Sequence, residues 1–469
     1  MSKKKKNIIL ENIKLISAGA KGVAVGKTEE GKTVLVTGAV PGDVVNARVK
    51  KAKSKYYEAE VLEVIEKSPY RVEPKCIHFG VCGGCKWQNL SYEKQLDFKQ
   101  EEVYNNIKRI GGLENFETLP ILGSKEQYFY RNKMEFSFSN ARWLTQYEIS
   151  SEENFGNRDA LGFHIPGMWS KILDLKECFL QEEPSNEIRL AVRDYAIKNG
   201  LDFYDVRNQE GFLRTLMLRQ NSKGEWMVLF QLYREEKENR ENLFNFVLEK
   251  FPQVKTLVYA INPKGNDSIY DLDIQNYYGE GFLMEEMDGL QFKIGPKSFF
   301  QTNYKQALEL YRKTIEFAEI SENDVVYDLY TGTGTIAQYI AKKAKYVIGI
   351  ESVQEAIDAA IEHAKLNGLE NCEFHCGDMK DVFTEEFLAN HPKADVLITD
   401  PPRDGMHQKV VEQILKLSPP KIVYVSCNSA TQARDLALMK EHYNVVKILP
   451  VDMFPQTHHV ENIALLVKK

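Results

Sequence analysis

The chain has 469 residues, of which 43% are hydrophobic and 27% charged, and its formal net charge is −6. A chain of this length and composition is expected to fold into two to four globular domains, and no apolar run in it reaches the length of a membrane span. The basic start is followed by only three apolar residues, too few for a secretory signal peptide, so we expect a cytoplasmic protein.

Residues 1–66 are predicted to form the first domain. Alternating apolar residues indicate five short strands separated by turns, at residues 8–10, 23–25, 33–36, 43–49 and 57–64. Five strands in so short a segment predict a small closed β-barrel of the oligonucleotide-binding type. The segment resembles the TRAM domain, an RNA-binding barrel.

The charge of this domain points to a polyanion partner. Residues 1–60 hold thirteen Lys and Arg against six Asp and Glu, a local charge of +7 that leaves −13 for the rest of the chain. One loop adds Tyr56 and Tyr57, which can stack on bases, to the lysines at positions 50, 51, 53 and 55. A solvated tail and loop explain the same charge equally well.

Four cysteines show a pattern typical of metal ligands. Cys76, Cys82 and Cys85 have the spacing C-x5-C-x2-C with Gly-Gly before the last, and Cys178 can supply a fourth thiolate. Unrelated buried thiols would give no reason for the Cys-Gly-Gly-Cys turn. Four thiolates suit either zinc or a [4Fe–4S] cluster. Zinc ribbons usually have two short cysteine pairs, so the triplet with one remote cysteine favours iron–sulfur.

Residues 67–290, which carry these cysteines, are predicted to form a central α+β domain. An apolar pattern over residues 91–113 predicts a helix, which could pack on the domain that follows. Two further strands interleave apolar residues with Arg131 and Lys133, or with Arg214 and Arg219. Such side chains can contact RNA phosphates, although ordinary amphipathic strands explain them equally well.

Residues 291–469 are predicted to form a doubly wound, Rossmann-like α/β domain. A turn with the sequence Asp328-Leu-Tyr-Thr-Gly-Thr-Gly joins the first strand to its helix, and Glu351 ends the second strand, where a carboxylate can hold a ribose diol. A dinucleotide cofactor is the rival interpretation. The turn lacks the third glycine of a pyrophosphate site and has no basic partner, which favours S-adenosylmethionine. Asp378 in Cys-Gly-Asp and the Asp400-Pro-Pro stretch strengthen that interpretation.

Polar residues follow two further strands of this domain. Cys427 comes directly after the apolar run Ile422–Val425 and Ser426, and Asp400-Pro-Pro-Arg403 follows another strand. Ligands of open α/β sheets bind at these carboxyl ends of the strands, which is where a nucleophile belongs. A lone cysteine is otherwise a small apolar residue at a strand end. A third stretch, Phe454 to Glu461, contains His-His-Val-Glu.

These motifs, together with Ser298-Phe-Phe-Gln-Thr-Asn303, are similar in order and number to those of the 23S rRNA (uracil-5-)-methyltransferases of the RlmD/RumA type, within the wider family that also contains the tRNA uracil-5 enzymes. The resemblance implies that Cys76, Cys82, Cys85 and Cys178 hold a [4Fe–4S] cluster. It implies that the residues contacting S-adenosylmethionine are Gln301, Tyr330, Glu351, Asp378 and Asp400.

The chemistry requires a thiol and a base. C5 of uracil is too poor a nucleophile to attack a methylsulfonium, but addition of the Cys427 thiolate at C6 gives C5 carbanion character. Glu461 can then remove the C5 proton, so that the thiolate leaves by elimination. Asp400 could accept the N3 proton or orient the base. The target nucleotide must flip out of the folded RNA, and we expect the barrel and central domain to hold that RNA.

Three alternatives remain open from the sequence. A tRNA uracil-5 methyltransferase would use the same residues, although the barrel and the cysteine cluster favour 23S rRNA. A methyltransferase acting on nitrogen could share Asp400-Pro-Pro-Arg403 but would need no thiol. An iron–sulfur RNA-binding protein without catalysis would bind no methyl donor. The reaction transfers no electrons, so the cluster is expected to be structural. We infer neither a membrane association nor an obligate protein partner.

Overall fold

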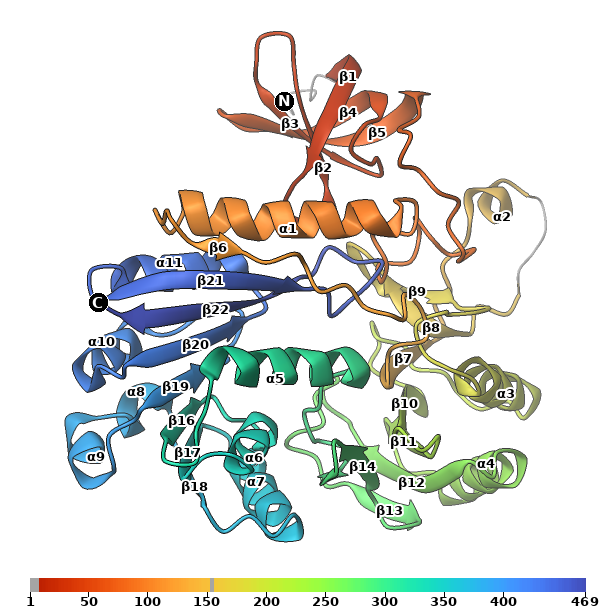
Figure 1. Ribbon diagram of the computed structural model, residues 1–469. Helices are drawn as coiled ribbons and strands as arrows, with labels where there is room; N and C mark the ends of the chain where they lie inside the picture. The colour runs from red at the N-terminus through yellow and green to blue at the C-terminus, as the bar shows by residue number, and fades with distance from the viewer. Residues whose placement is uncertain (1–7, 152–155) are drawn as a thin grey trace.

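The N-terminal segment folds as a closed barrel. The computed structural model describes residues 8–151 and 156–469, and in it the barrel strands are hydrogen-bonded in the order β1-β2-β3-β5-β4. Alternate side chains such as Leu15, Val34 and Val45 are fully buried inside it. The barrel forms one end of the molecule (Figure 1). Its strands are β1 (Ile9–Ala18), β2 (Ala24–Lys27), β3 (Thr33–Thr37), β4 (Val44–Ala52) and β5 (Tyr56–Glu66), with a 3-10 turn at Ala20–Gly22.

The first barrel strand is longer than the sequence pattern predicted. We expected a strand over residues 8–10, whereas β1 continues to Ala18. Asn12 adopts a left-handed φ of 52°, and the register of β1 with β4 shifts between Leu10 and Ile13. The bulge interrupts the alternation of apolar residues, so the pattern alone ended the strand too early.

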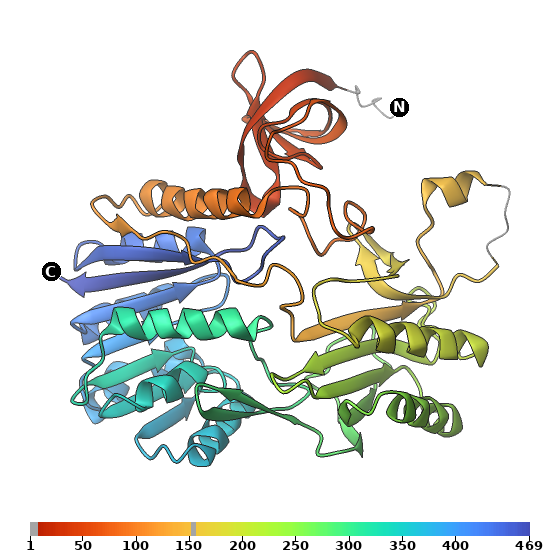
Figure 2. The ribbon, with the colours of Figure 1, turned by 45° about the vertical axis from the view of Figure 1, so that its right-hand side comes forward.

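The central region is built on a seven-stranded sheet of order β13-β12-β11-β10-β7-β8-β9. It lies beside the C-terminal sheet in both Figure 1 and Figure 2. Phe136, Leu216 and Phe230 are buried between its strands and the helices α3 and α4. Its elements are β7 (Lys133–Ser139), α2 (Gln146–Ser150), β8 (Ala160–Ile165), β9 (Met168–Asp174), α3 (Ser185–Lys198), β10 (Leu213–Gln220), β11 (Trp226–Leu232), α4 (Lys237–Lys250), β12 (Val254–Ile261) and β13 (Gln275–Tyr278).

A short hairpin connects the central and C-terminal regions. It consists of β14 (Leu283–Met287) and β15 (Leu290–Ile294), and its tight turn has Asp288 and Gly289 at positive φ. Phe292 and Ile294 pack in the core beneath the C-terminal helices. The hairpin therefore crosses residue 290, where the sequence analysis divided the two domains.

The C-terminal sheet has eight strands in the order β18-β17-β16-β19-β20-β22-β21-β6. The first five are parallel to one another, β22 runs antiparallel to β20, and β21 runs antiparallel to β22. This is the doubly wound pattern that the alternating strands and helices predict, with antiparallel strands added at one side. The strands are β6 (Glu117–Thr118), β16 (Val325–Leu329), β17 (Tyr346–Glu351), β18 (Cys372–Cys376), β19 (Val396–Thr399), β20 (Lys421–Ser426), β21 (Tyr443–Val451) and β22 (Glu461–Lys468).

Helices cover both faces of this sheet, and one of them comes from far upstream. α1 (Tyr92–Arg109) forms where the sequence predicts a helix at residues 91–113, and its Val103 and Ile107 are buried in the same core as residues of α10 and α11. In Figure 1, α1 lies between the barrel and strand β21. The other helices are α5 (Tyr304–Ala318), α6 (Thr335–Ala341), α7 (Gln354–Leu366), α8 (Met379–Val382), α9 (Glu385–Asn390), α10 (Gln408–Leu417) and α11 (Ser429–Met439).

Among the helices that the structure describes, none combines the length and the apolar character that a membrane span requires.

Candidate active site

Three chemically active side chains come together at one edge of the C-terminal sheet. Asp400 follows β19 and Cys427 follows β20, so both lie at carboxyl ends of parallel strands. Glu461 is the first residue of β22, which is antiparallel to β20 with Ser426 opposite Asn462. Because β22 runs the other way, its start lies at the same edge as the ends of β19 and β20. The topology thus places Glu461 beside Cys427.

The cysteine lies in an environment that opposes ionisation. Burial, together with the negative charges of Glu461 and Asp400, raises the pKa of Cys427 to about 11. Arg403 hydrogen-bonds to the thiol and lowers its pKa. The Arg403 backbone is held in turn, because its carbonyl accepts hydrogen bonds from the Asn428 amide (3.0 Å) and the Thr431 hydroxyl (3.0 Å). Arg403 is therefore the nearby cation that favours a thiolate.

The carboxyl groups around Cys427 titrate near neutral pH. Glu461 is 7% exposed, and burial together with the charge of Asp400 raises its pKa to about 8, against the opposing effect of Arg403. Burial and the neighbouring Asp328 raise the pKa of Asp400 to about 7. The pKa of Asp328 is itself raised to about 7, mainly by burial, although the Thr331 hydroxyl donates a hydrogen bond to it (2.6 Å). Groups with such values can accept and release protons under physiological conditions.

The residues expected to contact the methyl donor follow neighbouring strands and lie at the same edge of the sheet. Tyr330, Glu351 and Asp378 come after, or end, β16, β17 and β18. Glu351 fixes the glycine turn, because its carboxylate accepts hydrogen bonds from the Gly332 N–H (3.1 Å) and the Ser352 N–H (2.7 Å). A Cβ added at Gly332 would have no atom within 4 Å, so open space adjoins this turn. Tyr330 has a left-handed φ of 64°.

The other two expected donor contacts differ in how they are held. Asp378 caps α8 and pairs with Lys380 (2.5 Å). Gln301 lies just before α5, and its carbonyl accepts a hydrogen bond from Asn132 of the central region (3.1 Å). Four of the five predicted donor residues, Tyr330, Glu351, Asp378 and Asp400, therefore follow or end neighbouring parallel strands, whereas Gln301 lies on the segment before α5.

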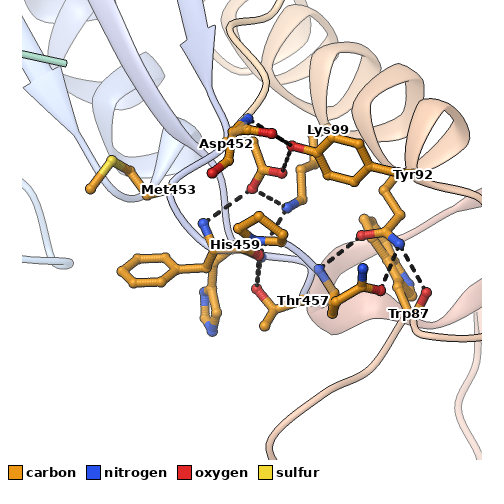
Figure 3. Close-up of polar contacts among 12 residues, drawn as sticks. Trp87, Tyr92, Lys99, Asp452, Met453, Thr457 and His459 are labelled. Atoms are coloured by element: carbon orange, nitrogen blue, oxygen red, sulfur yellow. Dashed lines mark hydrogen bonds and ion pairs between the residues drawn. The ribbon is translucent and has the colours of Figure 1, made fainter. Parts of the chain in front are cut away.

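The loop before Glu461 is held by α1 (Figure 3). Lys99 pairs with Asp452 (2.6 Å) and donates a hydrogen bond to the Phe454 carbonyl (3.2 Å), and the Tyr92 hydroxyl donates to Asp452 (2.8 Å). The Gln95 side chain both accepts from the Gln456 backbone N–H (2.9 Å) and donates to its side chain (3.0 Å). This segment, residues 452–459, is hereafter called the anchored loop.

A cavity of about 650 Å³ adjoins this site, between the central sheet and the C-terminal domain. Its charged lining residues are Arg131, Arg403 and the ion pair of Lys133 with Glu135 (2.7 Å), and Phe454 and His459 of the anchored loop form part of its wall. Arg403 also contacts Cys427, so the cavity reaches the immediate surroundings of the thiol. Its volume lies in the range of ligand sites, and its basic lining suits a phosphate-bearing ligand.

The four predicted metal ligands line a second, small cavity of about 30 Å³. All four are free thiols, and each sulfur accepts a hydrogen bond: Cys76 from the His78 backbone, Cys82 from the Gly84 N–H (3.4 Å), Cys85 from the Gln88 side chain and Cys178 from the Leu180 backbone. Hydrogen bonds to sulfur are a feature of protein-bound clusters. In the described chain, no three of these sulfurs lie within 4.8 Å of one another.

Several basic residues that the sequence offered for RNA binding have other partners. Arg214 and Arg219 are 2% and 3% exposed, and their guanidinium groups donate to backbone carbonyls of residues 262, 264, 295 and 298. They stabilise loops and cannot reach phosphates. In the barrel, Lys50 pairs with Glu60 (2.7 Å) and Lys51 with Glu58 (3.2 Å). The lysine run at residues 3–6 lies outside the described residues.

The sequence analysis assigned no role to four residues that the structure places in or around the site. Asp328 and Thr331 appeared in the sequence only as members of the glycine-turn motif. In the structure the Thr331 hydroxyl donates a hydrogen bond to Asp328. The ion pair of Lys99 with Asp452 joins residues 353 positions apart, so no local pattern could have revealed it.

Comparison with known families gives two matches. Residues 272–469 match the family described as tRNA (Uracil-5-)-methyltransferase, and residues 15–62 match the TRAM domain. The second match lies within the five-stranded barrel.

Relatives that match over nearly their whole length are named as RNA methyltransferases. Proteins named "Uncharacterized RNA methyltransferase" are 50% identical in Bacteroides thetaiotaomicron (95% of this chain, 99% of the relative) and 48% identical in Porphyromonas gingivalis (97% and 99%). Among solved structures, the tRNA (uracil-54, C5)-methyltransferase of Pyrococcus abyssi in complex with S-adenosyl-L-homocysteine is 29% identical, with a TM-score of 0.74 over 97% of this chain and 99% of that one.

Proposed function

Because this chain belongs to the tRNA (uracil-5-)-methyltransferase family of S-adenosylmethionine-dependent RNA methyltransferases, we propose that it methylates C5 of a uridine through a covalent bond between Cys427 and C6. The observation that carries this proposal is the convergence of Cys427, Asp400 and Glu461 at one edge of the sheet. Methylation of a nitrogen would not require the thiol, and RNA binding alone would not require the donor edge.

The first step joins enzyme and base. The Cys427 thiolate forms a bond to C6, and the C5=C6 electron pair moves to C5, with negative charge shared by the O4 carbonyl. Arg403, which lowers the pKa of the thiol, stabilises the thiolate before it attacks. Asp400 lies close to both Cys427 and Glu461, because its negative charge raises the pKa of each. Its proposed role is to orient the uracil base or to accept its N3 proton.

The second step transfers the methyl group and releases the product. C5 attacks the methyl carbon of the sulfonium, whose carbon–sulfur bond breaks to give S-adenosylhomocysteine. Glu461 then takes the C5 proton, the C5=C6 bond re-forms, and the Cys427–C6 bond breaks. Burial of Glu461 serves this role, because a base with a pKa of about 8 is stronger than an exposed carboxylate.

The donor is proposed to bind along the edge from β18 to β19, with contacts from Gln301, Tyr330, Glu351, Asp378 and Asp400. The Glu351 carboxylate already orients the glycine turn and can accept hydrogen bonds from a ribose diol. Open space beside Gly332 leaves room for the amino-acid end of the donor. The S-adenosylhomocysteine bound in the Pyrococcus abyssi relative supports this donor.

RNA is proposed to enter through the 650 Å³ cavity beside Arg403. A uridine flipped out of its stack would pass the basic residues Arg131 and Lys133 and reach Cys427 between the two domains. The TRAM barrel supports RNA binding away from the target base.

We propose 23S rRNA as the substrate, as the resemblance of motifs suggests. A second candidate is tRNA, because the Pyrococcus abyssi tRNA enzyme matches 97% of this chain. Because a tRNA enzyme matches nearly the whole of this chain, the presence of an N-terminal barrel does not by itself distinguish 23S rRNA from tRNA as the substrate.

The four cysteines are proposed to hold a [4Fe–4S] cluster with a structural role. The four cysteines line one small cavity, which supports a shared metal centre, and the cysteine triplet with one remote cysteine favours iron–sulfur over zinc. Cys178→Ala is expected to lose iron and sulfide, whereas Cys372→Ala, on β18, is expected to retain both. Stoichiometric zinc without iron in anaerobically purified protein would contradict the proposal.

The decisive experiment traps the covalent intermediate. Purified protein is mixed with S-adenosylmethionine and a 23S rRNA fragment containing 5-fluorouridine, with a tRNA carrying the same analogue in competition. Glu461 can remove a proton but not a fluorine cation, so elimination stalls and a protein–RNA adduct survives denaturation. The RNA that is trapped identifies the substrate.

Cys427→Ala and Cys372→Ala form a matched pair for this assay. The adduct should be absent from the first and unchanged in the second. An adduct that persists in Cys427→Ala would refute the assignment of Cys427 as the nucleophile. Methyl transfer to a normal uridine by Cys427→Ala at the wild-type rate would refute the covalent mechanism altogether.

A further inference from the structure

Away from the active site, a carboxylate and two imidazoles converge on the edge strand of the C-terminal sheet. Glu373 and His375 are two positions apart on β18, so their side chains lie on one face of the strand, and His391 follows α9 directly. One ligand atom from each lies within 4.8 Å of the other two, and in the described chain this is the single His, Cys, Asp and Glu group with that property. All three residues are partly buried.

The distances within this group are those of ligands around one metal ion. Glu373 Oε1 lies 2.9 Å from His375 Nε2 and 3.6 Å from His391 Nε2. Zinc bound to nitrogen and oxygen at about 2.0–2.1 Å places neighbouring tetrahedral ligand atoms about 3.3 Å apart. The observed separations bracket that value.

The contact between Glu373 and His375 is close but is not a well-formed hydrogen bond. His375 Nε2 is buried and has no hydrogen-bond partner with acceptable geometry, although the carboxylate oxygen is 2.9 Å away. A buried polar atom without a partner is unfavourable and calls for an explanation. Two lone pairs directed at a shared cation would satisfy both atoms.

In Glu373 and His391, the polar atom that does not face the other ligands already contacts a neighbouring group. The Tyr346 hydroxyl donates a hydrogen bond to Glu373 Oε2 (2.8 Å), which leaves Oε1 facing the histidines. His391 Nδ1 lies 2.7 Å from the Phe387 carbonyl, which can only accept, so Nδ1 carries the proton and Nε2 the lone pair. Metal-binding histidines and carboxylates typically have such supporting partners.

Aromatic packing fixes the imidazole rings. The Phe387 ring stacks on His391 with centroids 3.9 Å apart and meets His375 edge-on at 4.9 Å. The rings therefore have little freedom to rotate away, which lowers the entropy lost when a ligand binds.

We propose that Glu373, His375 and His391 form a binding site for a divalent transition-metal ion, with zinc as the ion that this His₂-carboxylate set suits best and water in the fourth position. The ion would connect edge strand β18 to the end of α9. One of its ligands, His375, lies three residues before Asp378 in the chain. The role of the ion would be structural. This inference does not depend on the proposed methyl transfer.

Zinc titration of the full-length protein tests the proposal. Calorimetry with Zn²⁺ should show one site that is lost in the double variant His375→Gln/His391→Gln and retained in His442→Gln, which changes an exposed histidine elsewhere. Titration with Co²⁺ separates this site from the four cysteines, because thiolate ligation gives near-ultraviolet charge-transfer bands and a His₂-carboxylate site gives none.

A supporting-residue variant distinguishes a built site from casual binding. Tyr346→Phe keeps all three ligands but removes the hydrogen bond to Glu373, and should weaken zinc binding about 10- to 100-fold. The proposal is overturned if wild type and the double variant bind Zn²⁺ with the same stoichiometry and affinity. It is also overturned if cobalt bound outside the cysteines persists in the double variant. Unchanged circular dichroism of each variant confirms that the fold is intact.

Discussion

Lys99 of α1 and Asp452 of the anchored loop form an ion pair in which neither side chain is exposed to solvent, with Nζ 2.6 Å from the carboxylate. Burial lowers the pKa of Lys99, and the charge of Asp452 opposes that effect. Both charges are satisfied, because Asp452 also accepts from Tyr92 and Lys99 also donates to the Phe454 carbonyl. A pair of this kind tolerates the loss of one partner poorly.

Lys99→Met should therefore destabilise the protein strongly. The substitution leaves the Asp452 carboxylate buried without its cation, which is expected to cost about 3–5 kcal/mol in the free energy of unfolding. Urea denaturation measures the change. Lys94→Met on the same helix is the matched control, since Lys94 also has an acidic partner at 2.6 Å but lies at the surface, and it should have little effect. Equal effects of the two variants would contradict the importance of burial.

Glu461→Gln should separate the two halves of the reaction. An amide cannot take the C5 proton, so methylated RNA should accumulate as a covalent adduct on a normal uridine. Turnover should fall by about 10²–10⁴-fold. Denaturing electrophoresis and a single-turnover methyl-transfer assay measure the two quantities. Glu441→Gln, at an exposed position, should behave as wild type. Loss of adduct formation in Glu461→Gln would instead place Glu461 in the first step.

Release of RNA from a preformed adduct should depend on pH mainly through Glu461, the base of this step, because Cys427 is then bonded to carbon. The pKa of Glu461 is raised to about 8, so the carboxylate fraction increases with pH up to that value. The elimination rate should rise about tenfold per pH unit well below pH 8 and level off above it. A pH-jump experiment on the isolated adduct measures this profile, and a rate independent of pH between 6 and 8 would argue for another base.

Arg403→Gln should make Cys427 less reactive. Removing the cation raises the pKa of the thiol further above about 11, and each additional unit lowers the thiolate fraction at neutral pH about tenfold. Asp400→Asn should lower the pKa of Cys427, because it removes a negative charge that raises this pKa. Alkylation of Cys427 by iodoacetamide across a pH series, followed by mass spectrometry, reports both changes without substrate. Shifts of the same sign in the two variants would be inconsistent with this electrostatic account.

The sequence predicted the strand ends better than the partners of the side chains. Cys427 and Asp400 could be placed because a buried strand followed by a polar turn has few alternatives in an α/β sheet. Glu461 was identified by its motif, but its closeness to Cys427 depends on β22 running antiparallel to β20, which no local pattern encodes. Arg214 and Arg219 are charged residues among apolar ones, as on a strand with a solvent-exposed face, yet both are buried and donate hydrogen bonds to carbonyl groups of distant loops.

The position of α1 in the chain has a consequence for biosynthesis. Lys99 precedes Asp452 by 353 residues, and at about 5–20 residues per second a ribosome needs roughly 20–70 s to make that interval. For most of that time α1 has been synthesised, but helix α11 and strand β21, which it packs against, have not. Helix α1 therefore lacks these partners while the central sheet and most of the C-terminal domain are made, and the active-site loop acquires its support only when the end of the chain is complete.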